Sequence, residues 1–219
     1  MTSTTNGDTT PSRRDRNKAA TRQALTRAAV DLSYEVGFDA VTADAVAERA
    51  GVSRRTFFNY FPSLEECITD PIQQVLDDAL AIVDAAPVEA PIMPLATTAF
   101  SEVFSPATTP HLVRVMLLVR EHPRLARSHL AQWRLIAGPV SDAVMRRTPD
   151  ADPLWAMTLA SSVLGVAEAA IENWLTSLPV ADITPDDAAL AAASESLRET
   201  VARSFGYLAD GFATPPPTP

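Results

Sequence analysis

The stretch AERAGVSRRTFFNYFPSLEE, residues 47–66, decides the fold of the N-terminal part of the chain. It places a glycine, Gly51, shortly before two adjacent arginines, and then four aromatic residues within five positions. Ser53 is a typical helix N-cap, and Ser63 begins a Ser-x-x-Glu capping box. The pattern therefore predicts a glycine turn, a short aromatic helix that ends near Phe61, and a new helix directly after it.

The aromatic helix has two chemically different faces. At about 100° per residue, Phe57, Phe58 and Phe61 fall on one side, where we expect them to pack against the preceding helix. The other side presents polar groups: Arg54, Arg55, Thr56, Asn59 and Tyr60. Arginine pairs with guanine edges, asparagine with adenine edges, and the threonine methyl contacts thymine. This face is suited to reading DNA.

Two further helices are expected before the aromatic one. The first covers residues 15–36, and a short second helix runs from a Thr42 cap to about Ala50. Two short helices joined by a tight glycine turn form a helix-turn-helix, whose second helix lies in the DNA major groove. Thr42 and Ser53 stand where hydroxyl and backbone N–H groups hold phosphate. Taken alone, a short aromatic run is more often plain core; the caps, the turn and the opposed faces together favour DNA binding.

Charge and composition agree with a chain that meets DNA at one end. The net charge of the 219 residues is −9. Up to Pro62 there are nine basic and seven acidic residues, whereas the remainder has nine arginines against twenty acidic residues. A solvated face without a partner explains this asymmetry equally well. A single cysteine, Cys67, excludes an internal disulfide. Without an apolar leader or a run of about 18 apolar residues, we expect a cytoplasmic protein that does not enter a membrane.

The rest of the chain reads as helical throughout. Only 7 glycines occur, prolines punctuate the segments, and no stretch alternates with a period of two. After the first three helices, further helices are predicted at about 64–86, 91–105, 110–121, 123–147, 153–178 and 185–210. The expected fold class is all-α, with about nine helices.

The segment VTADAVAERAGVSRRTFFNYFPSLEE, residues 41–66, closely resembles the N-terminal domain of the TetR family of bacterial transcriptional regulators. The resemblance covers residues 15–68. It implies an all-helical homodimer with a DNA-binding head and a ligand-binding body. The implied organisation is a disordered arm at 1–14, a helix-turn-helix domain at 15–66, a ligand-binding and dimerisation domain at 67–211, and a disordered tail at 212–219.

The resemblance also assigns DNA contacts in the head. The positions that match are Thr42, Ser53, Arg54, Arg55, Thr56, Asn59 and Tyr60. The chain departs from the family at Leu64, where relatives usually carry a phosphate-binding lysine. The basic residues of the N-terminal arm are available to compensate: Arg13, Arg14, Arg16 and Lys18.

Two segments of the body, REHPRLARSHLAQW (120–133) and AEAAIENWL (167–175), resemble the subgroup of acyl-CoA-like ligand-binding transcription factors, which includes the regulator of mycofactocin systems. The resemblance implies an apolar or acyl-type effector; fatty acid, acyl-CoA and drug remain open. Apolar pockets between helices suit such a molecule. The candidate ligand-binding residues are Phe100, Phe104, Met116, Arg120 and Trp133. For each apolar member, plain core is the competing reading, and for Arg120 a surface ion pair.

The last two helices carry apolar stripes at a spacing of three to four residues, which suits a four-helix bundle across a two-fold axis. Part of each stripe must also serve the core of one chain. The expected dimer residues are Val163, Val166, Ala170, Trp174, Leu197, Val201 and Phe205.

The sequence offers little support for an enzyme. Its three histidines, His111, His122 and His129, have no metal-ligand spacing with Cys67, and no phosphate-binding or nucleophile motif occurs. We expect no catalytic residue, cofactor or metal. The leading hypothesis is a ligand-responsive repressor that binds a palindromic double-stranded DNA operator as a homodimer and is released by a small apolar or acyl-type effector. The alternatives are a ligand-independent activator or architectural DNA-binding protein and, more remotely, a helical lipid carrier or enzyme.

Overall fold

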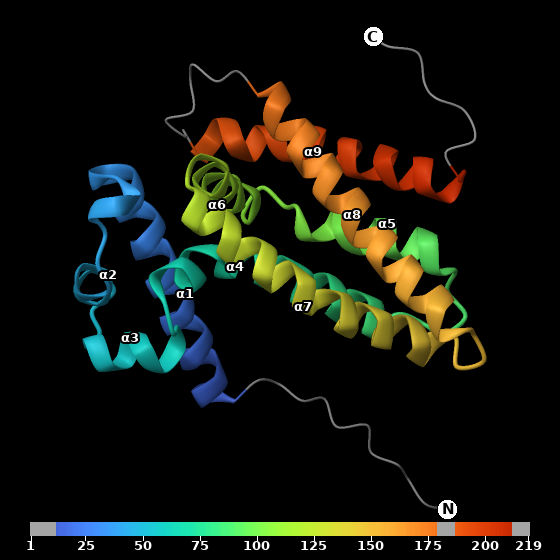
Figure 1. Ribbon diagram of the computed structural model, residues 1–219, viewed down its shortest axis with the longest axis horizontal. Coiled ribbons are helices and arrows are strands. Elements are labelled where there is room, and N and C mark those ends of the chain that lie inside the picture. Colours follow the sequence, from blue (N-terminus) through green and yellow to red (C-terminus); the bar gives the residue numbers. More distant parts are fainter. Residues whose placement is uncertain (1–11, 179–186, 212–219) are drawn as a thin grey trace, which may run out of the picture. The chain divides into compact units, whose positions relative to one another are not determined.

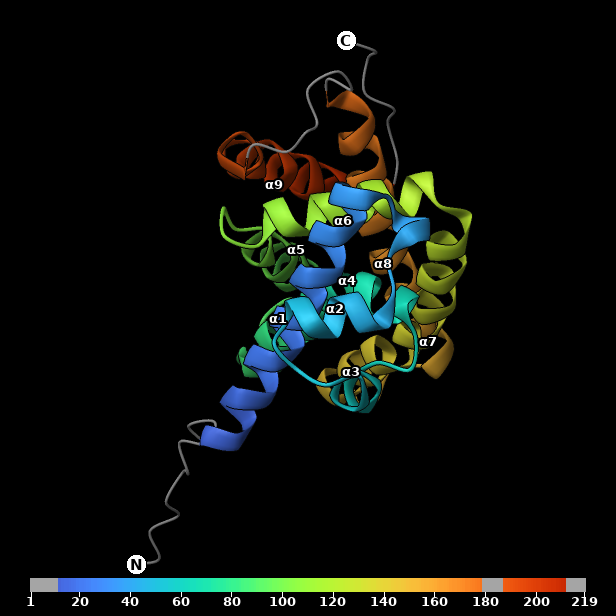
Figure 2. The same cartoon turned by 90° about the vertical axis from the view of Figure 1, so that its left-hand side faces the viewer.

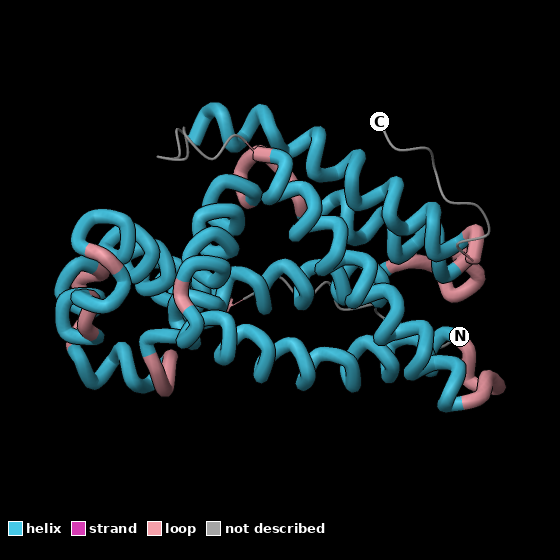
Figure 3. The backbone as a smooth tube through the Cα atoms, turned by 45° about the horizontal axis from the view of Figure 1, so that its top comes forward, coloured by secondary structure: helices cyan, strands magenta, loops and turns pink. Residues whose placement is uncertain are grey.

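The structure is a computed structural model that describes residues 12–178 and 187–211, except for the side chains of Arg134 and residues 187–193. The described part contains nine α-helices, one short 3₁₀-helix and no strand (Figures 1 and 3). The predicted all-α class is therefore confirmed. The chain divides into two compact units, Met1–Ile68 and Thr69–Pro219.

Unit 1 contains three helices and the first residues of a fourth: α1 (Arg13–Val36), the 3₁₀-helix η1 (Phe38–Ala40), α2 (Ala43–Arg49), α3 (Arg54–Tyr60) and the start of α4 (Leu64–Ala85). Helix α1 begins two residues earlier than expected. The Asp15 amide donates to the Ser12 hydroxyl (3.2 Å) and the Ser12 amide donates to the Asp15 carboxylate (3.2 Å), which forms a capping box. Residues 13 and 14 are therefore helical rather than part of a disordered arm; the rest of the expected arm lies outside the described residues.

Of the two phenylalanines in helix α3 and the third at its C-cap, two hold the helix in place. Phe57 is 0% exposed and Phe61 2%, whereas Phe58 is 46% exposed. The expectation that all three pack inward is therefore wrong for Phe58, because one residue along a helix is a rotation of about 100°. Its ring lies at the edge of the core, with the guanidinium carbon of Arg54 5.4 Å from the ring centre. The guanidinium of Arg22 on α1 similarly lies over Phe61, at 4.7 Å.

The two connections within this unit depend on glycine. Gly37 after α1 has φ 84°, and Gly51 between α2 and α3 has φ 69°. Both values lie in the left-handed region, where a side chain is strained. An exposed ion pair also joins α1 and α2: Arg49 donates two hydrogen bonds to the Glu35 carboxylate, at 2.9 and 2.7 Å. These hydrogen bonds lower the pKa of Glu35.

Unit 2 contains the rest of α4 and five further helices: α5 (Ile92–Val103), α6 (Thr109–Glu121), α7 (Pro123–Arg147), α8 (Pro153–Ser177) and α9 (Asp187–Ala209). Helix α8 packs against both α7 and α9, and α9 also contacts α5 and α6 (Figures 1 and 2). The predicted helices agree with these bounds to within two residues. The predicted start of the last helix, at residue 185, lies outside the described residues.

Arg147 at the end of α7 binds the chain at the end of α4. Its guanidinium donates to the carbonyl oxygens of Val83 (3.0 Å), Ala86 (3.2 Å) and Pro87. Carbonyl groups at a helix C-terminus have no partner within the helix and carry partial negative charge, so an arginine suits this position. The contact fixes the end of α4 against the end of α7.

Helix α8 is long and apolar enough, by length and composition, to cross a membrane. The expectation that no segment has this property is therefore corrected. Core helices of soluble proteins also have it, but only 33% of the most apolar window of α8 is buried within the chain. Much of this apolar helix is thus left uncovered by the described part of one chain.

The unequal burial of two adjacent phenylalanines gives a direct test of the core of unit 1. We expect Phe57→Ala to destabilise this unit by about 3–5 kcal/mol, because a cavity replaces a fully buried ring. Phe58→Ala is the matched control and should cost less than about 1 kcal/mol. Hydrogen exchange of the α1–α3 amides in the full-length protein measures both changes. Equal loss of protection in the two variants would contradict this description of the core.

Candidate functional site

Helix α3 presents an exposed polar face opposite its buried phenylalanines. Arg55 and Asn59, one turn apart, are both exposed, and Thr56 and Tyr60 beside them are half-buried. Within the described part of the chain, Arg55 makes no hydrogen bond or ion pair. Its guanidinium is thus available for a ligand without loss of an internal contact.

Arg54, at the first position of α3, is already paired. It donates to the Asp44 carboxylate at 2.5 Å, and both side chains are more than half exposed, at 64% and 57%. Exposed pairs of this kind contribute little stability, so Arg54 can exchange Asp44 for another anion at small cost. Arg54 and Arg55 therefore differ in availability, which the sequence does not indicate.

Thr42 and Ser53 cap their helices as expected. The Thr42 hydroxyl accepts from the Ala45 amide at 3.2 Å. The Ser53 hydroxyl accepts from the Thr56 amide at 3.0 Å and lies 2.8 Å from the Thr56 hydroxyl. These bonds fix the start of α2 and α3 and keep the two hydroxyls at the surface.

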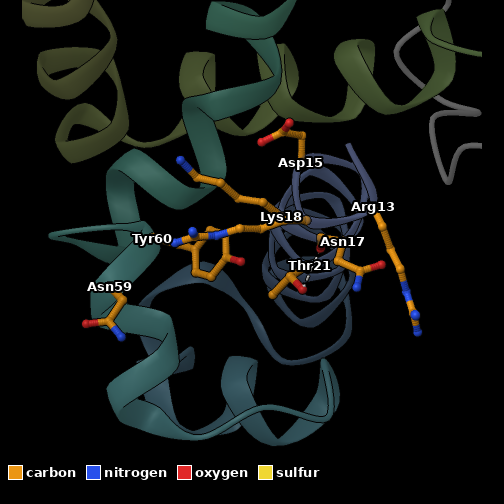
Figure 4. A pocket seen from close by; sticks show the side chains of 8 residues that line it. Arg13, Asp15, Asn17, Lys18, Thr21, Asn59 and Tyr60 are labelled. Carbon is orange, nitrogen blue, oxygen red and sulfur yellow. Dashed lines mark hydrogen bonds between the residues drawn. The ribbon is translucent and has the colours of Figure 1, made fainter. Parts of the chain in front are cut away.

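An open hollow of about 870 Å³ lies beside α3. Figure 4 shows Lys18 and Thr21 of α1 near Tyr60 of α3, with Asn59 on the same helix. The complete lining is Arg13, Arg14, Asp15, Asn17, Lys18, Thr21, Asn59 and Tyr60. Three cations oppose one carboxylate, and that carboxylate is engaged in the capping box of α1. The hollow is therefore a basic, hydrogen-bonding surface.

Of the predicted DNA contacts, Asn59 and Tyr60 line the hollow, together with three of the four basic arm residues. Asn17 and Thr21 line it, although the sequence did not single them out. Thr21 lies four residues after Asn17 and three after Lys18, so it is a neighbour of both on the surface of α1, and this spacing was the available signal. Arg16, expected to help, is exposed but does not border the hollow. Leu64, which replaces the family lysine, is half-buried.

Four of the five candidate ligand residues in the body meet at one cavity of about 20 Å³. They are Phe100, Phe104, Met116 and Trp133. Arg120 is exposed and does not line it, so the structure separates this residue from the other four. The cavity is just large enough for a water molecule, so it is a gap between packed side chains rather than a preformed ligand site.

Two polar residues that the sequence did not single out also line this cavity: His129 of α7 and Glu168 of α8. Burial lowers the pKa of His129, and burial together with the nearby Glu172 raises the pKa of Glu168. The ring centres of His129 and Trp133 are 5.6 Å apart. His129 and Glu168 lie in the two segments that resemble ligand-binding regulators. A histidine or a glutamate does not by itself indicate a ligand site, so the sequence did not identify them.

A second cavity, of about 50 Å³, shares Leu76 and Phe100 with the first. Its remaining walls come from α4, α5, α7 and α8 and are entirely aliphatic. Phe100 also lies against Phe205 of α9, with ring centres 5.3 Å apart. The two cavities are thus neighbours within one apolar helical bundle.

The predicted dimer residues are mostly inside one chain. Six are at most 6% exposed: Val163, Ala170, Trp174, Leu197, Val201 and Phe205. They form the contact between α8 and the neighbouring helices, and the Trp174 indole donates to the Ser196 hydroxyl at 2.8 Å. A side chain that is covered within one chain presents little surface to a second, so the structure places these six residues in the core of one chain. Val166, which is half-buried, is the exception.

The described residues include no group of three or more His, Cys, Asp or Glu that could hold a metal ion. Cys67, the single cysteine of the sequence, is buried, as expected of a small apolar side chain.

Two family descriptions match the sequence. "Bacterial regulatory proteins, tetR family" matches residues 25–69, which include α2 and α3. "MftR C-terminal domain" matches residues 90–213, more than half of the chain. The first match includes the exposed face of α3 but not the α1 residues of the hollow, and the second includes the cavity walls from α5 to α8 but not those from α4.

Three relatives are regulators from distant bacteria. The chain is 29% identical over 170 residues to MftR of Mycobacterium tuberculosis, a protein named for transcriptional regulation of mycofactocin biosynthesis, covering 75% of this chain and 84% of that one. It is 33% identical to RutR of Escherichia coli, covering 54% of this chain and 50% of RutR. It is 41% identical to YdeS of Bacillus subtilis over 64 residues, covering 29% of this chain and 32% of YdeS. The chain thus spans half or less of the latter two.

Solved structures agree on the fold. A TetR regulator from Nitrosomonas europaea superimposes with a TM-score of 0.51 at 15% identity, covering 86% of this chain and 97% of that one. GusR of Salmonella enterica gives 0.50 at 16% identity, covering 86% and 94%. Since the N-terminal helix-turn-helix and more than half of the chain match one family, the chain belongs to the TetR family of DNA-binding transcriptional regulators.

Proposed function

We propose that the protein is a ligand-responsive repressor that binds a palindromic operator as a homodimer. The observation that carries this proposal is the exposed pair Arg55 and Asn59, on a short helix whose opposite face is fixed by buried phenylalanines. A guanidinium and an amide one turn apart can contact adjacent bases in a major groove. The DNA sequence would be read mainly by these two side chains.

The basic hollow beside α3 would hold the DNA backbone. Lys18, Arg13 and Arg14 supply positive charge, and the Tyr60 hydroxyl and Thr21 hydroxyl supply hydrogen bonds. Contacts with phosphate fix the orientation of a protein on DNA without reading the bases. These residues offer a source of backbone contacts in place of the lysine absent at Leu64, and Thr42 and Ser53 would add hydroxyl donors.

The homodimer would form through the uncovered face of α8. Ser161, Gly165 and Ala169 lie one turn apart on this face and are all exposed. Small side chains at this spacing let two helices approach closely. At the beginning of α8, Leu154 and Met157 add apolar side chains that are 68% and 57% exposed. A second copy would cover this surface and place two α3 helices on a two-fold axis.

The effector would be a small apolar or acyl-type molecule bound among α4, α5, α7 and α8. The lining of both cavities is almost entirely apolar, but drug-sized ligands occupy about 300–1,000 Å³. Binding would therefore require these helices to move apart. Helix α4 contributes residues to both compact units. A movement of α4 in unit 2 could therefore be transmitted along this continuous helix to unit 1 and weaken DNA binding.

A regulator of this kind acts where the chromosome lies, and we propose that it is cytoplasmic. The apolar character of α8 would then serve the dimer and the core rather than a membrane.

The assignment of base contacts is tested by Arg55→Ala. We expect a loss of about 1–3 kcal/mol at one base pair of each half-site, because the guanidinium contact is removed while the fold is untouched. Arg27→Ala, an exposed arginine of the same unit outside the hollow, is the matched control and should bind normally. Fluorescence anisotropy at fixed salt, on duplexes with each base pair changed in turn, measures both. Unchanged affinity and base preference in Arg55→Ala would remove this residue from the interface.

The dimer surface is tested by Gly165→Arg. A Cβ at Gly165 meets nothing within 4 Å in one chain, so the protomer should fold normally, while the arginine blocks approach of a second α8. Gly138→Arg on α7, equally unobstructed, is the control and should remain dimeric. Sedimentation velocity should detect monomers only for Gly165→Arg, together with weaker operator binding. A Gly165→Arg dimer with normal affinity would place the interface elsewhere.

A further inference from the structure

The smaller cavity of the body has a distinct polar side. Twelve residues line it, and nine of them are aliphatic, methionine or phenylalanine. The other three, His129, Trp133 and Glu168, come from α7 and α8. Glu168 is also exposed to solvent, so it stands at the rim of the cavity, whereas His129 is 9% exposed.

These polar groups are not used by the protein itself, as far as the described side chains extend. Within them, Glu168 makes no hydrogen bond or ion pair, and neither His129 nor Trp133 makes a hydrogen bond. The charged group that acts on Glu168 is Glu172, one turn further along α8, and it carries the same charge. A carboxylate left beside another carboxylate and an apolar wall favours a positive partner.

The aromatic neighbours favour the same kind of partner. The rings of Trp133 and His129 lie side by side on the wall of the cavity, and Phe104 contributes another ring. Aromatic faces attract ammonium groups, and the attraction strengthens where water is excluded. Burial lowers the pKa of His129 and so favours its neutral imidazole, which can accept a hydrogen bond from an N–H group.

The larger cavity supplies the apolar half of a binding site. All fourteen of its lining residues are apolar, and it meets the smaller cavity at Leu76 and Phe100. Along α7, the spacing of four, seven and four residues from His129 through Trp133 and Val140 to Val144 keeps one helix face along both cavities. Displacement of the Phe100 ring would join the two cavities into one channel with a polar end and an apolar end.

We propose that the body binds a hydrophobic amine. Its protonated amino group would lie between Glu168 and Trp133, and its hydrocarbon part would extend past Phe100 into the larger cavity. The inference rests on the proposed effector site; it keeps the apolar part of the effector and replaces the acyl-type end group by an amine. An apolar chain suits both the proposed effector and the amine. A carboxylate or phosphate end group is disfavoured, because it would meet the like charges of Glu168 and Glu172.

The test compares end groups on one hydrocarbon chain. Dodecylamine, 1-dodecanol and dodecanoate, each below its micelle-forming concentration, are titrated into the full-length protein by calorimetry and into its operator complex by anisotropy. Dodecylamine should bind at least about tenfold more tightly than dodecanoate and should release the operator. Glu168→Gln, which keeps the shape of an exposed side chain, should remove most of this preference. Glu199→Gln, an exposed carboxylate on α9, is the matched control and should retain it.

Each of the other outcomes overturns one part of the proposal. Equal or tighter binding of dodecanoate overturns the amine assignment and leaves an apolar effector site standing. A preference for amine that survives in Glu168→Gln overturns the placement of the amino group. Binding without any change in operator affinity supports the site and contradicts the effector role. If no probe binds to the unchanged protein or to Glu168→Gln, the amine site and the proposed apolar effector are both wrong. The proposal of DNA binding does not depend on that result.

Discussion

Helix α3 has seven residues, which is too short for a stable isolated helix in water. Its orientation therefore depends on the burial of Phe57 and Phe61, each of which contributes about 1.5–3 kcal/mol. Once these two rings are fixed, the geometry of a helix directs Arg55 and Asn59 to the opposite side. The exposed polar face that we propose to read DNA is thus a consequence of how the aromatic residues pack.

In the body, the main constraint is the incomplete burial of one apolar helix. Helix α8 is apolar over most of its length, but only part of it is covered within the described chain. The covered side forms the core with α7 and α9, and the exposed side carries small residues suited to a second copy. The same helix places Glu168 at the rim of an otherwise apolar cavity. Dimerisation and effector binding would therefore use opposite or adjoining faces of one element, so a change at one can affect the other.

Local signals predicted much of the fold. Ser53 and Thr42 cap helices as their types indicate, Gly51 adopts the positive φ of a turn, and prolines mark helix edges. Helix α1 starts two residues before the predicted position, because Ser12 and Asp15 form a capping box in which an aspartate takes the usual place of glutamate or glutamine.

Side-chain placement was harder to predict, because it depends on which neighbour covers each helix face. A three-to-four residue stripe marks the apolar side of a helix, but it does not say whether that side meets its own chain or another. Trp174 and Phe205 were therefore assigned to the dimer although both are buried in one chain. The predicted burial of Phe58 is wrong for a similar reason, since the rotation of one residue along the helix moves its ring to the edge of the core. His129 and Glu168 gain significance only from the cavity that three-dimensional packing creates around them.

We propose above all that two copies of α3 read a symmetric DNA sequence. Selection of tightly bound duplexes from a random pool by the full-length protein, followed by sequencing, tests it most directly. We expect one enriched motif with two inverted half-sites, whose centres are separated by about 10 base pairs or a multiple of that spacing. Enrichment of an unpaired half-site, or of no sequence at all, would contradict it.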